Sequence, residues 1–198
     1  MPKKNIRRIL FLTYPEAELL DLVGPLSVFN TASRMSDEAS YECTIASETG
    51  GLIAHSCGTQ LDTRALSSIR FTATDTVLVI GAVTRPTKEA IKVGALTHAL
   101  KLAAQRVHRY GSICTGSFLL GAAGLLEGKR VATHWSACTK LKEAFPNTEA
   151  DGESLYVEDG KLWSSAGVTA GIDMALAMVK QDLGKAVTSQ VAKMMVVY

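Results

Sequence analysis

One stretch of the chain, HRYGSICTGSFLLGAAGLL at residues 108–126, constrains the fold more than any other. An apolar segment typical of a strand ends at Ile113, Cys114 follows at the corner, and small and apolar residues typical of a helix begin directly behind it. This order of strand, tight turn and helix predicts a nucleophile elbow with Cys114 at its tip. Such a turn needs small neighbours, which are present as Ser112, Thr115 and Gly116.

The predicted elbow gives Cys114 a chemical interpretation. The first N–H groups of a helix and its dipole stabilise an anion, so we expect a thiolate that is nucleophilic near neutral pH. The alternative is a buried structural cysteine, because a free cysteine packs as a small hydrophobic residue. The strand-turn-helix context favours the nucleophile.

Segments typical of strands and helices alternate along almost the whole chain. We expect strands over 8–14, 41–47, 76–80, 107–113 and 130–133, hairpins that end near 60 and 164, and helices over 17–29 (restarting near Pro25), 87–105, 136–145 and 171–183. This alternation predicts one α/β domain over residues 1–198, flavodoxin-like, with a mostly parallel central sheet and helices on both faces. The apolar residues of 185–198 favour packing against a core over reading DNA bases.

The carboxyl ends of the predicted strands supply the candidate site, because ligands of parallel sheets bind there. Gly81, Cys114 and His134 each follow a predicted strand. The backbone N–H groups of Thr115 and of the turn at Gly81 and Ala82 are candidate donors to a developing oxyanion. Asp21 is a carboxylate between apolar residues, which makes it a candidate acid or base, with helix capping as the alternative.

Composition excludes several other classes. The four cysteines form no C-x-x-C pair, so we expect neither a disulfide framework nor a metal site, and no cofactor. A net charge of +2 predicts no nucleic-acid surface, and the basic residues at 3, 4, 7 and 8 are interpreted as the solvated flank of the first strand. No apolar run approaches the roughly 18 residues of a membrane span and no signal peptide is recognised, so we expect a cytoplasmic protein without membrane contact.

Three motifs resemble the ThiJ/PfpI superfamily, which is related in fold to the class I glutamine amidotransferases. They are LLDLVGPLSVF at 19–29, SICTGSFLLGAAGLLEGKRVATHW at 112–135 and WSSAGVTAGIDMALAMV at 163–179. Two branches share this pattern. One is the isonitrile hydratases, whose catalytic Cys and Asp correspond to Cys114 and Asp21, and the other is the N-terminal domain of AraC-family transcriptional regulators.

The third motif and the chain's last residues favour the regulator branch. The resemblance then implies a ligand-sensing, dimerising domain with a small-molecule pocket near Cys114, Asp21, Ala82 and His134. It would contact DNA only through a C-terminal helix-turn-helix domain that is absent from this chain. Thr115 stands where the superfamily's proteases place a histidine, so peptidase activity is not expected, and Ala82 replaces the second glycine of a common Gly-Gly turn.

Two other functions stay open. The first is an enzyme that hydrates an isonitrile or a related electrophile, with Cys114 as nucleophile, Asp21 as acid and base, and Thr115 and Gly81 as oxyanion donors. The second is a sensor in which oxidation of Cys114 is the signal.

Overall fold

A computed structural model describes residues 5–197 of the chain. The predicted Lys3 and Lys4 flank lies outside these residues. Most of the strands pair into one sheet of eight, in the order β3-β4-β2-β1-β5-β6-β10-β9, and β7 and β8 form a separate parallel pair. The strands are β1 (Asn5–Leu12), β2 (Ala39–Ser47), β3 (Gly51–Ala54), β4 (Gln60–Ala65), β5 (Thr76–Val79), β6 (Arg109–Ile113), β7 (Arg130–Ala132), β8 (Glu149–Asp151), β9 (Tyr156–Asp159) and β10 (Leu162–Ser165).

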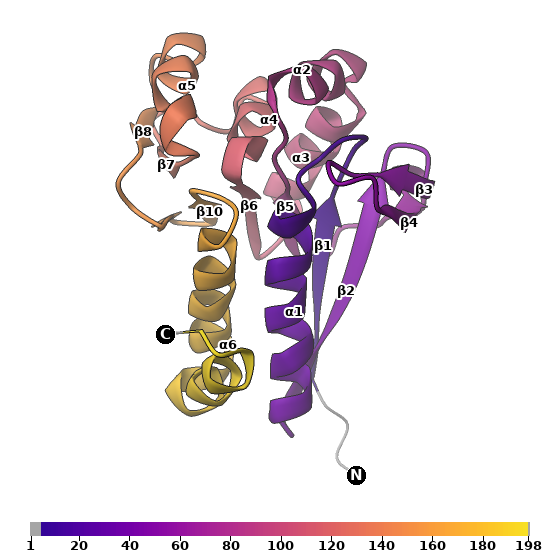
Figure 1. The fold of residues 1–198 in the computed structure, drawn as a ribbon, viewed down its shortest axis with the longest axis vertical. Coiled ribbons are helices and arrows are strands. Elements are labelled where there is room, and N and C mark those ends of the chain that lie inside the picture. Colours follow the sequence, from indigo (N-terminus) through magenta and orange to yellow (C-terminus); the bar gives the residue numbers. More distant parts are fainter. Residues whose placement is uncertain (1–4, 198) are drawn as a thin grey trace.

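Helices cover both faces of the sheet. In Figure 1, α1 and α6 stand side by side along the sheet, and α2, α3 and α4 form a second group. The α-helices are α1 (Leu19–Met35), α2 (Thr84–Val93), α3 (Ala95–Arg106), α4 (Ser117–Ala122), α5 (Cys138–Ala144) and α6 (Ala170–Met195). Short 3₁₀ turns precede α4 and α5, at Cys114–Gly116 and Trp135–Ala137. The predicted α/β class is confirmed.

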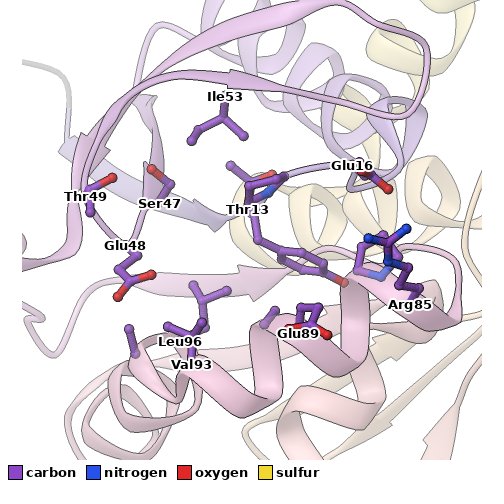
Figure 2. Close-up of a pocket in the computed structure, with 15 residues that line it drawn as sticks. Thr13, Glu16, Ser47, Glu48, Thr49, Ile53, Arg85, Glu89, Val93 and Leu96 are labelled. Carbon is purple, nitrogen blue, oxygen red and sulfur yellow. The ribbon is translucent and has the colours of Figure 1, made fainter.

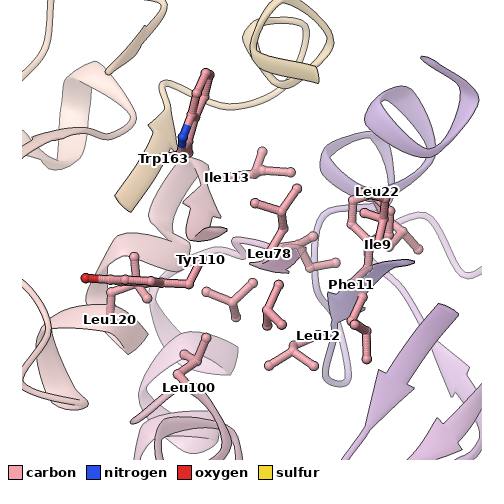
Figure 3. Close-up of a cluster of buried hydrophobic side chains, with 14 of the residues drawn as sticks. Ile9, Phe11, Leu12, Leu22, Leu78, Leu100, Tyr110, Ile113, Leu120 and Trp163 are labelled. Atoms are coloured by element: carbon pink, nitrogen blue, oxygen red, sulfur yellow. The ribbon is translucent and has the colours of Figure 1, made fainter. Parts of the chain in front are cut away.

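The middle of the sheet is parallel and apolar. Strand β1 pairs in parallel with both β2 and β5, and β6 pairs in parallel with β5 and β10. Every residue of β5 is buried, as are the last four of β1, which suits strands covered on both faces. Figure 3 shows Phe11, Leu78 and Ile113 within the resulting core.

The order of the strands reverses at β1. The chain passes from β1 to β2 on one side of it and from there to β5 on the other. In an open parallel sheet, such a switch point leaves a crevice at the carboxyl ends of the strands. The loops after β1, β5 and β6 all reach this edge, which places Tyr14, Gly81 and Cys114 there.

Helix α1 is continuous, although Gly24 and Pro25 predicted a restart. Pro25 lacks the N–H that would bond the Asp21 carbonyl, but close packing compensates. A Cβ on Gly24 would lie 3.0 Å from Ile172 of α6, and one on Gly171 would lie 3.1 Å from Pro25. The prediction was wrong because contact between the two helices outweighs the local preference.

Other differences also occur at glycines or between distant strands. The single helix predicted over 87–105 is two helices, because Gly94 adopts a φ of 81° between them. The predicted hairpin consists of β3 and β4, and it ends at Ala65 rather than near Gln60 because β4 also pairs in parallel with β2 at Arg64 and Ala65. The helix predicted over 171–183 does end there, because Gly184 has a φ of 82° and interrupts α6, which continues as a second helical segment to Met195. Val191 is buried as expected, but Met194 and Val196 are exposed.

Arg7 and Arg8 are not a solvated flank. Arg7 forms an ion pair with Asp182 at 3.4 Å, and Arg8 forms one with the fully buried Asp75 at 3.5 Å. The prediction was wrong because the carboxylate partners lie far away in the sequence.

Candidate functional site

Cys114 occupies a strained elbow, as predicted. It directly follows β6 and has a φ of 56°, a left-handed conformation that side chains other than glycine rarely adopt. The backbone of the elbow lies close to its surroundings, because a Cβ on Gly116 would lie 2.4 Å from the Val79 carbonyl oxygen. Strain of this kind persists only where neighbouring structure holds it.

Two glycines from distant parts of the chain hold the cysteine between them. A Cβ on Gly81 would lie 2.9 Å from the Cys114 Cβ, and one on Gly167 would lie 2.3 Å from the same atom. Both positions therefore require glycine. Gly167 was missed as a site residue, because its contact with Cys114 depends on how β10 pairs with β6.

Asp21 lies in the first turn of α1, completely buried, and next to the elbow. Its Oδ1 accepts the Val168 N–H at 2.6 Å, and its Oδ2 has no hydrogen-bond partner among the described residues. Burial raises the pKa of Asp21 to about 6, although the N–H groups of Val168 and Gly81 and the Cys114 side chain act to lower it. Capping falls instead to Glu18, whose carboxylate accepts the Leu20 N–H.

The Cys114 thiol is stabilised in its protonated form. Burial, followed by the nearby Asp21 carboxylate, raises the pKa of Cys114 to about 12, against opposing hydrogen bonds from Thr115. This direction opposes the predicted thiolate, because desolvation and a like charge outweigh the favourable end of a short helix.

Thr115 ties the elbow to the turn after β5. Its hydroxyl donates to the Ala82 carbonyl at 2.6 Å and accepts the Ala82 N–H at 2.9 Å. The Gly81 N–H acts on Asp21, and the Thr115 N–H acts on Cys114. Of the predicted oxyanion donors, Thr115 is the one whose N–H faces the cysteine.

His134 follows β7 as predicted, but its recorded hydrogen bonds stay within its own loop. Its Nδ1 lies 2.8 Å from Ser136 Oγ and accepts the Ser136 N–H. The preceding Thr133 hydroxyl instead donates to the Cys114 carbonyl at 3.1 Å. The structure therefore brings Cys114, Asp21, Thr115, Gly81 and Ala82 together, and among the described contacts Thr133 rather than His134 links this strand to the elbow.

A cavity of about 300 Å³ lies beside this cluster, at the switch point of the sheet. Figure 2 shows it between the loops after β1 and β2 and the helix α2. Its polar and charged lining residues are Thr13, Tyr14, Glu16, Ser47, Glu48, Thr49, Arg85 and Glu89. Cys114 and Asp21 are not among the lining residues.

Tyr14 connects the cavity to the elbow. Its hydroxyl lies 3.3 Å from Thr87 Oγ1, and burial, with the charges of Asp21 and Cys114, raises its pKa. This cavity was not predicted from the sequence, although the residues that follow the first strand were a usable signal, because ligands of open parallel sheets bind where the strand order reverses.

Residues 5–197 contain no group of three or more His, Cys, Asp or Glu residues arranged to hold a metal ion. None of their helices is both long and apolar enough to cross a membrane.

Comparison with known proteins places the chain among several relatives. It is 39% identical over 142 residues to an uncharacterized protein in the cpoL 5' region of Streptomyces lividans, which covers 71% of this chain and 96% of that protein. It is 28% identical over 196 residues to the HTH-type transcriptional regulator GbdR of Pseudomonas aeruginosa, covering 98% of this chain but 51% of the regulator. It is 29% identical to an isonitrile hydratase of Pseudomonas putida, covering 89% of this chain and 72% of that enzyme.

Solved structures give the same fold. A THiJ/PfpI family protein from Pseudomonas syringae superposes with a TM-score of 0.84 at 26% identity, covering 98% of this chain and 76% of that one. An AraC family transcriptional regulator from Pseudomonas putida superposes with a TM-score of 0.82 at 20% identity, covering 96% and 99% of the two chains. The sequence pattern of the DJ-1/PfpI family matches residues 7–181. With its elbow cysteine and sheet order in place, this chain belongs to the DJ-1/PfpI family.

Proposed function

We propose that this domain is the ligand-sensing, dimerising part of a helix-turn-helix transcriptional regulator, with a small-molecule pocket near Cys114. The observation that carries the proposal is the match to GbdR, which spans 98% of this chain and about half of that regulator. A second regulator, GlxA of Rhizobium meliloti, matches 91% of this chain and 55% of its own length. Homodimerisation and DNA contact through a further domain are parts of the same proposal.

The site supports sensing more than unassisted nucleophilic chemistry. The Cys114 thiol stays protonated near neutral pH because burial and Asp21 raise its pKa to about 12. Gly167 and Val168, which contact Cys114 and Asp21, immediately precede α6. A ligand that moves either side chain would therefore act directly on the start of α6, the helix that leads to the end of this chain.

A fusion experiment tests the proposal. The domain is joined to a DNA-binding module that represses a reporter only as a dimer, with the unfused module as control. We expect repression by the fusion and a change in repression with members of a metabolite library that also raise the domain's melting temperature. A folded fusion that leaves the reporter at the level of the unfused module would contradict dimerisation, and a library without any response would contradict sensing.

The second candidate is a hydratase of the isonitrile hydratase type, and the pairing of Cys114 with Asp21 favours it. Cys114 would attack the electrophilic carbon while a protonated Asp21 supplies the proton, and the reaction would add one water molecule in total. Turnover of cyclohexyl isonitrile is the assay, with Cys114→Ala as the test and the exposed Cys57→Ser as the control. This candidate predicts activity that only Cys114→Ala abolishes; no activity in the unmodified protein would rule it out.

A further inference from the structure

We infer that the cavity at the switch point, rather than the elbow itself, is a recognition site for a small molecule that carries an ammonium group. The cavity lies between the loops after β1 and β2 and the helix α2, and Cys114 is not part of its lining. Its volume of about 300 Å³ is at the lower end of the range for small-molecule sites. The inference concerns ligand binding by this domain, which can be measured whether or not the domain regulates transcription.

The charges around the cavity select a cation. Glu16, Glu48, Glu89 and Arg85 line it, which leaves an excess of two negative charges. All four are exposed, and the ion pairs and side-chain hydrogen bonds recorded for the described residues include none of them. Unpaired carboxylates around a concave apolar site attract cations and raise their local concentration.

The interior of the cavity suits an apolar body. Ile53, Ala90 and Leu96 are in the lining, and Tyr14 adds an aromatic side chain. The buried hydroxyl of Thr13 already pairs with His55 Nε2 at 2.9 Å, and that of Ser47 pairs with Thr63 Oγ1 at 2.7 Å. Because these hydroxyl groups already have partners, a ligand in the cavity does not need to form hydrogen bonds with them.

The charged residues lie on different sides of the cavity. In Figure 2, Glu48 lies on the side opposite to Glu16 and Arg85, and Glu89 lies between them. An ammonium group near Glu48 would therefore leave Arg85 for a carboxylate at the other end of the same molecule. Free cations and zwitterions share the ammonium group, and the experiment separates them.

The test uses four probes of matched size: pentylammonium, pentan-1-ol, pentanoate and 5-aminopentanoate. Binding is followed by backbone amide chemical shifts of the ¹⁵N-labelled domain. We expect the two ammonium compounds to shift amides at residues 13–16, 47–49 and 85–96, and to bind at least about fivefold more tightly than the alcohol or the acid, in line with a partly solvated charge pair. Equal affinity for pentylammonium and pentan-1-ol, or shifts located elsewhere, would overturn the inference.

Variants assign the effect to individual charges. The pair Glu48→Gln and Glu89→Gln should weaken pentylammonium binding about tenfold together, while the exposed Glu143→Gln on α5 should leave it unchanged. Arg85→Gln should strengthen pentylammonium binding and weaken 5-aminopentanoate binding relative to it. Ala90→Leu, which fills the cavity from its wall, should weaken both ammonium probes, with the amide spectrum reporting that the variant folds.

The outcomes separate this inference from the proposed function. Selective ammonium binding without any effect on a reporter fusion would uphold the site and contradict its role in regulation. A reporter that responds to compounds without an ammonium group, in a protein that does not bind the probes, would uphold regulation and contradict the site.

Discussion

Two aspartates with buried side chains, Asp21 and Asp182, lie at opposite ends of the sheet and have contrasting surroundings. Asp21, at the carboxyl end, accepts the Val168 N–H through Oδ1 and has no cationic partner among the described residues. Asp182, midway along α6, contacts Arg109 at 2.5 Å and Arg7 at 3.4 Å, and accepts the Tyr41 hydroxyl at 2.9 Å. The same residue type is therefore paired with cations at one end and left without one at the other.

The difference shows that a buried carboxylate can either stabilise the fold through an ion pair or remain a titratable acid. A buried carboxylate that meets a guanidinium is neutralised by its partner and fixes two elements together, here α6 and β6. A buried carboxylate without a cation keeps its proton to higher pH, as Asp21 does with a pKa of about 6. The carboxyl end of the sheet thus keeps a titratable group beside the strained Cys114.

The largest effect should come from removing Asp182. Asp182→Ala leaves the buried Arg109 guanidinium without its carboxylate, and we expect a loss of about 3–5 kcal/mol in the free energy of unfolding. Urea denaturation measures it. The half-exposed pair of Lys129 and Asp159 is the control, because Asp159→Ala should cost about 1 kcal/mol or less. Similar losses at both sites would contradict a structural role for the Asp182 cluster.

Asp21 should instead make stability depend on pH. Because its pKa is raised when folded, the folded protein retains a proton that the unfolded chain loses, so stability falls as the pH rises from about 4 to about 6. A shift of about two units corresponds to about 3 kcal/mol. Asp21→Asn should remove this slope, as measured by urea denaturation at several pH values. A slope that survives the substitution would assign it to another group.

Crowding around the elbow should have the next largest effect. Gly167→Ala combines a φ of +96° with a Cβ that would lie 2.3 Å from the Cys114 Cβ, so we expect a loss of about 2–3 kcal/mol. Gly160→Ala is the matched control, because its φ of +65° is also left-handed but nothing lies within 4 Å of its Cβ. It should cost about 1 kcal/mol, from backbone conformation alone. Equal costs would mean that the elbow tolerates an added methyl group.

The smallest effect concerns the strained donor to Asp21. Val168 has a φ of 52°, so Val168→Gly should relieve strain and, after the entropy of the unfolded chain is counted, stabilise the protein by about 0.5 kcal/mol. Val196→Gly is the matched control with a φ of 56°. Both should raise the melting temperature, but Val168→Gly alone should also shift the pH dependence assigned to Asp21. If neither changes stability, positive φ costs little at these valines.

Local sequence determined most of the elements and the elbow. The continuous apolar run at 76–80 predicted β5, and the small residues behind Ile113 predicted the turn at Cys114, because these features depend on neighbours along the chain. Alternation of strands and helices was sufficient for the fold class. It also placed Gly81 and Cys114 at one edge, since parallel strands end together.

Only the tertiary structure decided the ion pairs, the pKa shifts and the cavity. Arg7 and Arg109 converge on Asp182 from distant segments of the chain, and no spacing in the sequence indicates these ion pairs. The raised pKa of Cys114 arises from burial and from Asp21, which is brought near by the packing of α1 beside the elbow. Local sequence fixes backbone conformation because turns and helices need nearby residues, whereas desolvation, ion pairing and cavity shape depend on atoms that only the folded chain brings together.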